Sequence, residues 1–157
     1  MPTRREFLAV AGAVATAGCS GLAGSTPTPE ETATAESVFR SRARSEIPQG
    51  GHRAIEFTPE TVGQMRIFYE MGVIGDGEID VYVLEGPELD DYEADEPMVS
   101  YHPGLSAFDV GSERRARRVT AERYGIVFDN TDRATDATAD VTVQHRIRVT
   151  RVGPPDR

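Results

Sequence analysis

The chain has 157 residues and a mass of 17.1 kDa, with 26 acidic residues against 17 basic ones and a formal net charge of −9. Every basic residue is arginine, and lysine is absent. This composition indicates an acidic surface adapted to high salt, and it argues against nucleic acid and anionic lipid as partners of the bulk surface. Hydrophobic residues make up 38% of the chain, which is enough for one small core without disulfides or a metal.

Residues 1–18 have the layout of an export signal. Arg4 and Arg5 form a short basic region, and a 12-residue apolar run over 7–18 follows them. A membrane-spanning helix takes about 20 apolar residues, so this run is too short to span and is typical of a secretory signal. The paired arginines, followed by Phe and Leu, resemble the twin-arginine signal, an address read by a receptor that exports folded proteins.

The one cysteine of the chain follows this run directly. Residues 16–19, Thr-Ala-Gly-Cys, resemble a lipobox, in which the cysteine becomes the first residue of the mature protein and carries a lipid. A disulfide needs a second cysteine, which the chain does not offer. The resemblance therefore implies lipidation of Cys19 and a protein held at the extracytoplasmic face of the cell membrane. An ordinary export signal with an incidental cysteine is the alternative.

Residues 19–37 are expected to form a lipidated flexible tether. Behind the cysteine the segment is small, polar and rich in Pro and Thr, with Leu22 as its one large apolar residue. Such a segment cannot bury enough apolar surface to offset the entropy of ordering it. A flexible chain of this length has a mean span of about 25 Å, which would hold the following domain clear of the lipid headgroups.

From residue 38 onward, apolar and polar residues alternate with the period of two that half-buried strands show. The clearest predicted strands cover 64–70, 78–85 and 141–149. Further strands are predicted over 53–57, 98–101, 117–121 and 123–128, with one helical turn over 87–92. Because Gly, Pro and Asp turns separate these strands, the sequence predicts an all-β fold for residues 38–157: an antiparallel sandwich of seven or eight strands, either jelly-roll or immunoglobulin-like.

Two of these strands also carry a family resemblance. Residues 80–84 read Asp-Val-Tyr-Val-Leu, and residues 124–130 read Tyr-Gly-Ile-Val-Phe-Asp-Asn. They resemble a group of envelope β-sandwich domains common in halophilic archaea, which are similar to GOLD and pre-peptidase C-terminal domains. In this chain Arg123 stands where the group usually has glycine before the tyrosine. The resemblance covers roughly residues 51–152, and it implies a binding or accessory module without a catalytic residue.

Candidate metal ligands are weak. Asp76, Glu78 and Asp80 alternate like the acids of a calcium loop, because hard cations take several oxygens from a tight turn. The downstream glycine and the distal acid of such a loop are missing, and Glu78 and Asp80 are expected on the solvent face of a strand. The three histidines are too far apart in the sequence for a zinc motif, and His145 is expected at a sheet margin. No metal and no cofactor are therefore predicted.

A run of arginines offers the candidate site for a partner protein of the envelope, and its members are Arg114, Arg115, Arg117 and Arg118. Nucleic acid is not expected there, because phosphate binding weakens steeply as salt rises and the compartment is wrong. The alternative is that this run and the acidic segment 88–96 neutralise one another or an acidic partner protein.

The sequence thus predicts a non-catalytic, membrane-anchored lipoprotein of the cell envelope that serves as a binding or structural module. Catalysis is not expected, since Ser106 lacks the glycine that a nucleophile elbow requires two residues later. The alternative function is a solute- or calcium-binding accessory subunit of a membrane transporter or enzyme.

Overall fold

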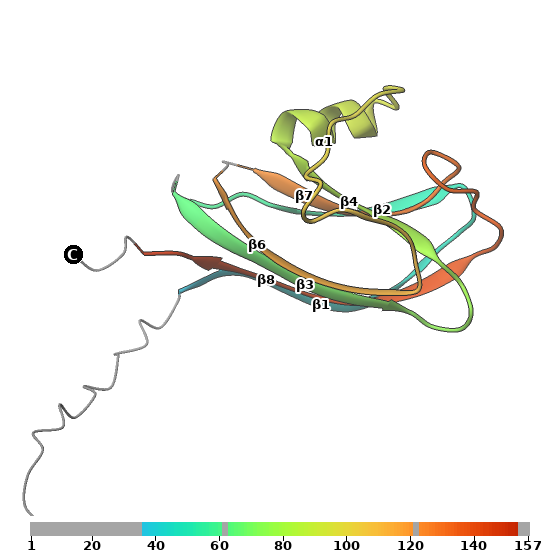
Figure 1. Cartoon of the computed structure of the whole chain (residues 1–157), viewed down its shortest axis with the longest axis horizontal. Helices are drawn as coiled ribbons and strands as arrows, with labels where there is room; N and C mark the ends of the chain where they lie inside the picture. The colour runs from blue at the N-terminus through green and yellow to red at the C-terminus, as the bar shows by residue number, and fades with distance from the viewer. Residues whose placement is uncertain (1–35, 61–62, 121–122, 154–157) are drawn as a thin grey trace, which may run out of the picture. The chain divides into compact units, whose positions relative to one another are not determined.

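The computed structural model describes residues 36–60, 63–120 and 123–153. The predicted export signal, Cys19 and almost all of the predicted tether therefore lie outside the described residues. The described part consists of two four-stranded antiparallel sheets packed face to face (Figure 1). The predicted all-β antiparallel sandwich is confirmed.

The elements in chain order are β1 (Ser37–Ile47), β2 (Gly51–Phe57), β3 (Gln64–Val73), β4 (Ile79–Glu85), α1 (Gly86–Glu93), β5 (Ala107–Val110), β6 (Ser112–Thr120), β7 (Tyr124–Asn130) and β8 (Val141–Arg151). Six of the predicted strands and the helical turn fall on these elements. The strand predicted over 98–101 is wrong, because these residues form part of an irregular loop. Prolines at 97 and 103 flank the segment and remove backbone donors that a strand would need.

The strand order distinguishes the two sandwich types that the sequence left open. Sheet A has the order β1-β8-β3-β6, and sheet B has the order β2-β7-β4-β5. Apart from β4 and β5, strands that are neighbours in a sheet are distant in the sequence, because the other connections cross between the sheets. This is the order of an eight-stranded jelly roll. In the immunoglobulin fold, strands that follow each other in the sequence pair within a sheet.

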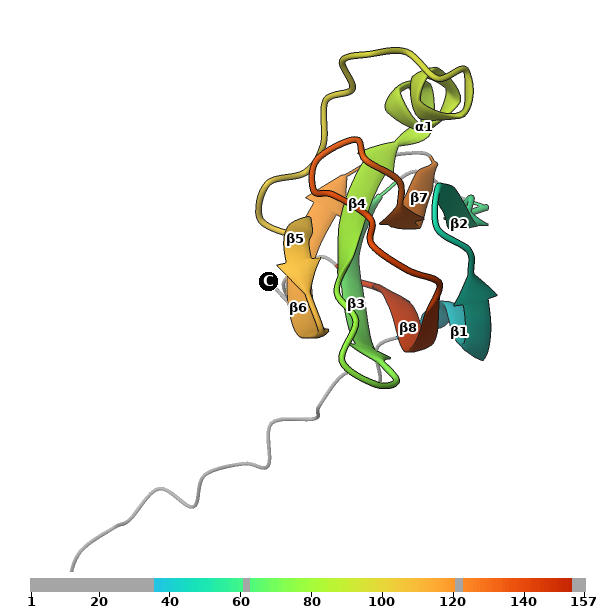
Figure 2. The same ribbon diagram turned by 90° about the vertical axis from the view of Figure 1, so that its right-hand side faces the viewer.

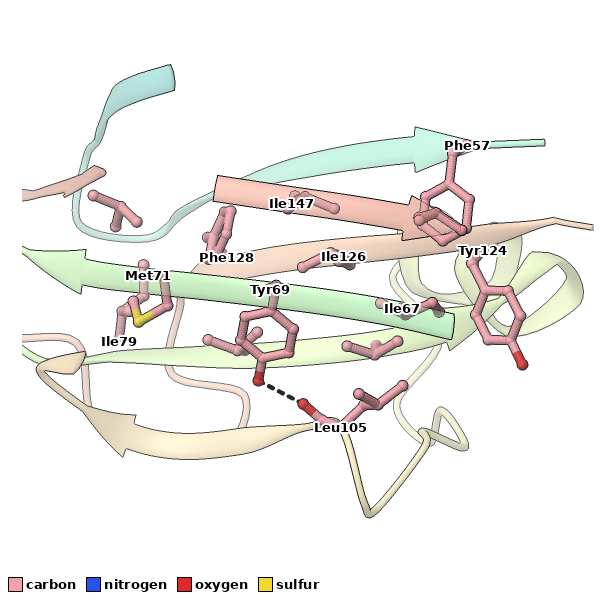
Figure 3. Packing of buried hydrophobic residues seen from close by; sticks show 14 of the residues in the cluster. Phe57, Ile67, Tyr69, Met71, Ile79, Leu105, Tyr124, Ile126, Phe128 and Ile147 are labelled. Carbon is pink, nitrogen blue, oxygen red and sulfur yellow. Dashed lines mark hydrogen bonds between the residues drawn. The ribbon is translucent and has the colours of Figure 1, made fainter. Parts of the chain in front are cut away.

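The main core lies between the sheets, where alternate residues of both sheets meet (Figure 3). On β3, Ile67 and Tyr69 are fully buried, and they face side chains such as Ile126 on β7. Burial raises the pKa of Tyr69, so its hydroxyl stays protonated and donates a hydrogen bond of 2.5 Å to the carbonyl oxygen of Leu105. This bond ties the loop before β5 to the middle of the core.

A second, smaller core covers the outer face of sheet B. Helix α1 and the loop behind it lie over this face (Figure 2), and Leu89 and Tyr92 of the helix pack on Tyr82, Leu84 and Val127. The sheet carries Gly125 under the helix, where a β-carbon would come within 2.6 Å of Leu89 Cδ2. Strands β4 and β7 are consequently buried on both faces, whereas the described elements cover sheet A on one face alone.

Arg123 connects helix α1 to sheet B. Arg123 precedes β7, and its guanidinium donates to Asp90 Oδ1 of α1 at 2.8 Å and to Glu56 Oε2 of β2 at 2.9 Å. Ion pairs at an exposed surface add little stability. The geometric effect is that one side chain connects the covering helix to the edge of the sheet beneath it.

Replacing Tyr69 by phenylalanine tests the connection between the core and the loop before β5. Tyr69→Phe removes the donor and leaves the Leu105 carbonyl unpaired in the core, so we expect a loss of about 1–2 kcal/mol in the free energy of unfolding. Urea denaturation of the full chain measures it. Tyr101→Phe is the control, because Tyr101 is 43% exposed and its hydroxyl has no hydrogen bond among the described residues. An equal, small effect of both variants would contradict the assignment.

Candidate functional site

The outer face of sheet A is the large sheet surface that no other described element covers (Figures 1 and 2). Strand alternation decides which residues occupy it. In β8 the odd-numbered residues from Val141 to Val149 are buried, so the even-numbered ones point outward. The same parity holds in β3, where Met65, Ile67 and Tyr69 are buried. The even-numbered residues of all four strands therefore form one surface.

Arginines dominate this surface. The strand register places Arg40 beside Arg148, Arg42 beside Arg146, and Arg66 beside Arg118. We call the outward-pointing set the arginine face, and its members are Arg40, Arg42, Arg44, Arg66, Arg114, Arg118, Arg146 and Arg148. Side chains at directly opposed positions of neighbouring strands have β-carbons about 5 Å apart, so like charges are brought close together here.

The arginine face is not neutralised within the described part of the chain. The ion pairs there involve Arg115, Arg123, Arg133 and Arg151, and none involves a member of the arginine face. Two glutamates share the surface: Glu70, opposed by Arg146 and Arg114, and Glu46 near one end. Eight positive charges thus face two negative ones in a chain whose net charge is −9.

The few contacts of these arginines leave their charges available. The Nε atom of Arg40 donates to Ser37 Oγ at 2.8 Å, and the Arg114 guanidinium lies over the ring of Phe68, 5.2 Å from its centroid. Seven of the eight side chains are exposed, and Arg148 is half-buried. Opposed like charges destabilise a sheet. The fold therefore carries a cost at this surface, which the position of Glu70 between Arg146 and Arg114 offsets in part.

An open hollow of about 690 Å³ lies at one end of the arginine face. The arginines that line it are Arg42, Arg44 and Arg146, and Glu70 is the one acidic residue of its lining. Gly72 and Ser112 also line it, and their small size leaves room above the sheet. An anionic group the size of a phosphate can approach the guanidinium groups from this side.

The predicted partner-binding run is divided by strand alternation. Arg114 and Arg118 belong to the arginine face. Arg115 and Arg117 point to the opposite side of β6, where Arg115 pairs with Glu113 at 3.3 Å. The predicted neutralisation of this run by the acidic segment 88–96 is wrong within the described residues, because the cations paired with that segment are Arg123 and Arg133.

The expectation that Asp80 faces solvent is also wrong. Asp80 is fully buried on the outer face of sheet B, because the loop after β7 covers that face. Its Oδ1 accepts hydrogen bonds from the Asp109 N–H at 2.8 Å and the Thr135 hydroxyl at 2.9 Å. Its Oδ2 accepts one from the Thr135 N–H at 3.1 Å. The carboxylate of Asp80 thus anchors two loops.

The other two calcium candidates lie at an acidic hollow of about 770 Å³. Asp76 and Glu78 line it together with Asp109. A hydrogen bond shared with Asp109 and the charge of that residue raise the pKa of Glu78. Among the described residues, no group of three or more His, Cys, Asp or Glu side chains is arranged to hold a metal. The alternative function as a calcium-binding subunit gains no support from these residues.

His145 lies in the main core and not at a sheet margin. It is buried on β8, an inner strand of sheet A, and its ring stacks on Phe128 with the centroids 5.2 Å apart. Its Nε2 and Ser41 Oγ are within hydrogen-bond distance, at 3.1 Å. Burial lowers the pKa of His145, and the charge of Arg53 adds to this effect. Ser41 is thus its polar neighbour.

Comparison with known proteins adds no identity to these features. No protein-family model matches the chain, and no curated protein matches it. Within the described residues, the structure has no helix with the length and apolar character needed to cross a membrane.

Replacing Asp80 tests whether its carboxylate serves the fold. Asp80→Asn replaces one carboxylate oxygen by an NH₂ group, which then faces a group that donates a hydrogen bond to Asp80. We therefore expect a loss of about 1–3 kcal/mol in the free energy of unfolding. The measurement is chemical denaturation with calcium and, separately, with a chelator. Asp76→Asn is the matched control, and we expect it to be nearly neutral because Asp76 is exposed. Stabilisation by calcium that either substitution abolishes would contradict a purely structural role.

Proposed function

We propose that this protein is a non-catalytic module of the cell envelope, held at the extracytoplasmic face of the membrane by a lipid on Cys19. In this proposal it works by binding a polyanionic partner through the arginine face. The observation that carries the binding function is the set of eight outward arginines without ion pairs in the described residues. The twin-arginine and lipobox resemblances of residues 1–19 support the location.

The chemistry of guanidinium groups favours a partner that carries phosphates or carboxylates. A guanidinium donates two parallel hydrogen bonds to such a group, which adds short-range contact energy to the attraction of the charges. At molar salt the screening length is about 3 Å, so long-range attraction is lost and contact pairs remain. Salt weakens phosphate binding at this face as it does for nucleic acid. Two-bond contact pairs depend less on long-range attraction, so a broad array of guanidinium groups can still bind a polyanion in the salty surroundings that the acidic composition indicates.

The structural contact made by the Ser106 side chain supports a non-catalytic role. This serine is buried, and its hydroxyl oxygen accepts a hydrogen bond of 2.9 Å from the Val83 N–H. Its side chain thus contributes to the attachment of the loop before β5. His145, the buried histidine, contacts Ser41 on the opposite side of the core.

Substitution of Cys19 tests the proposed anchor. In the native host, we expect the wild-type protein in the membrane fraction with a lipid in its mass. We expect Cys19→Ser to carry no lipid and to appear outside the cell after the membranes are washed in about 1 M phosphate, which screens the charges and also competes for the guanidinium contact pairs of the arginine face. Ser20→Ala serves as the control and should stay with the membrane. Retention of Cys19→Ser after the wash, together with a wild-type mass that lacks lipid, would refute the proposal.

A further inference from the structure

We infer that the polyanionic partner of the arginine face is the anionic headgroup layer of the membrane that carries the lipid anchor, so that the domain lies with sheet A against the lipid. This inference rests on the proposed function, because it takes the anchor at Cys19 as given. It names the partner and the orientation of the domain, which the proposed function leaves open.

The first support is the place where the chain enters the domain. The predicted tether leads directly into β1, which begins at Ser37 and is an edge strand of sheet A. Arg40, Arg42 and Arg44 follow within the next few residues of the same strand. The tether is expected to hold the domain clear of the headgroups, but a mean span of about 25 Å allows contact as well. A tether of this length keeps the attached face at a high effective concentration near the membrane, so weak contacts suffice to hold it there.

The second support is the division of charge between the two sides of the sandwich. Helix α1 lies on the side of sheet B, opposite the arginine face (Figures 1 and 2). Its acidic residues, and those of the turn that follows it, are Glu88, Asp90, Asp91, Glu93, Asp95 and Glu96. At contact, the guanidinium groups of one side can pair with anionic headgroups, whereas the carboxylates of the other side cannot. The charge distribution therefore selects a single orientation with sheet A toward the lipid.

The third support is the kind of surface that the arginine face presents. Interfaces between proteins have an apolar centre from which charges are depleted. The arginine face has charges on all four strands, and its large apolar side chain, Phe68, is half-buried beneath the Arg114 guanidinium. Lipid phosphates are mobile anions that can meet each guanidinium separately, so they require no matching shape.

The physics of lipid anchors supplies a reason for such a face. A basic patch beside a lipid anchor is a second membrane-binding signal that strengthens the attachment. Clusters of four to eight basic residues beside an anchor bind anionic headgroups. The eight members of the arginine face meet this requirement. The net charge of −9 argued against anionic lipid as a partner of the bulk surface. The arginine face is positively charged, so that argument does not apply to it.

The test measures binding of the full chain to lipid vesicles. The full chain carries Cys19→Ser, so that no acyl chain contributes, and the vesicles are either phosphatidylcholine alone or an equal mixture with phosphatidylglycerol. The test variant adds Arg42→Gln and Arg146→Gln on the arginine face. The matched control adds Arg53→Gln and Arg117→Gln, two exposed arginines on other surfaces without ion pairs in the described residues. Both double variants have the same net charge, and thermal unfolding checks that both fold.

We expect binding to the mixed vesicles that is at least tenfold stronger than binding to phosphatidylcholine and weakens as salt is added. The arginine-face variant should bind the mixed vesicles about tenfold more weakly, whereas the control should change less than twofold. Equal losses in both variants, or no preference for the mixed vesicles, would overturn the inference. The inference would also be overturned if the protein bound soluble polyglutamate but not vesicles, and if the arginine-face variant lost this binding. That result would indicate an acidic protein partner. Retention of Cys19→Ser in washed membranes is a separate failure, which concerns the anchor.

Discussion

The covering of sheet B by helix α1 and its following loop determines which surface of this molecule can act on a partner. Both sheets of a jelly roll bury their inner faces, and here sheet B also buries its outer face under Leu89 and Tyr92. The close approach of the helix depends on Gly125, which leaves the space that Leu89 fills. Within the described part of the chain, sheet A therefore presents the large open sheet face, and the composition of this face decides how the domain meets its surroundings.

Cross-strand register then converts a scattered set of arginines into one surface. Each of the four strands contributes residues at even-numbered positions. In one row across the sheet, the register places Arg42, Arg146, Glu70 and Arg114 side by side in that order. The average charge of the chain conceals this arrangement, because the acids gather on the other side of the sandwich. A protein that is acidic as a whole can thus carry a strongly basic face, and its electrostatics are those of two opposed surfaces.

Much of the fold could be predicted from period-two alternation, and the failures have physical reasons. Alternation identifies β3 and β8 well, because each buries one face. Alternation wrongly predicted that Asp80 faces solvent. The outer face of sheet B is covered, and the buried carboxylate there accepts hydrogen bonds from two loops. The segment 98–101 alternates like a strand but covers the second core as a loop.

The candidate site was visible in part. The arginines at 40, 42 and 44, and those at 146 and 148, already alternate in the sequence, and this pattern indicates that each group shares a face. Their alignment in one sheet depends on the pairing of β1 with β8, which are separated by almost the whole domain. Pairing between distant strands cannot be read from a single sequence. The predicted run at 114–118 attracted attention because it is continuous, yet half of it points away from the surface.

Arginine-specific chemical footprinting tests the central claim most directly. The full-length protein is treated with phenylglyoxal in solution and on phosphatidylglycerol-containing vesicles, and mass spectrometry measures the modification of each arginine. The account predicts that the vesicles protect the members of the arginine face, while Arg53 and Arg117 react as they do in solution. Uniform protection of all arginines, or protection centred on Arg53 and Arg117, would contradict it.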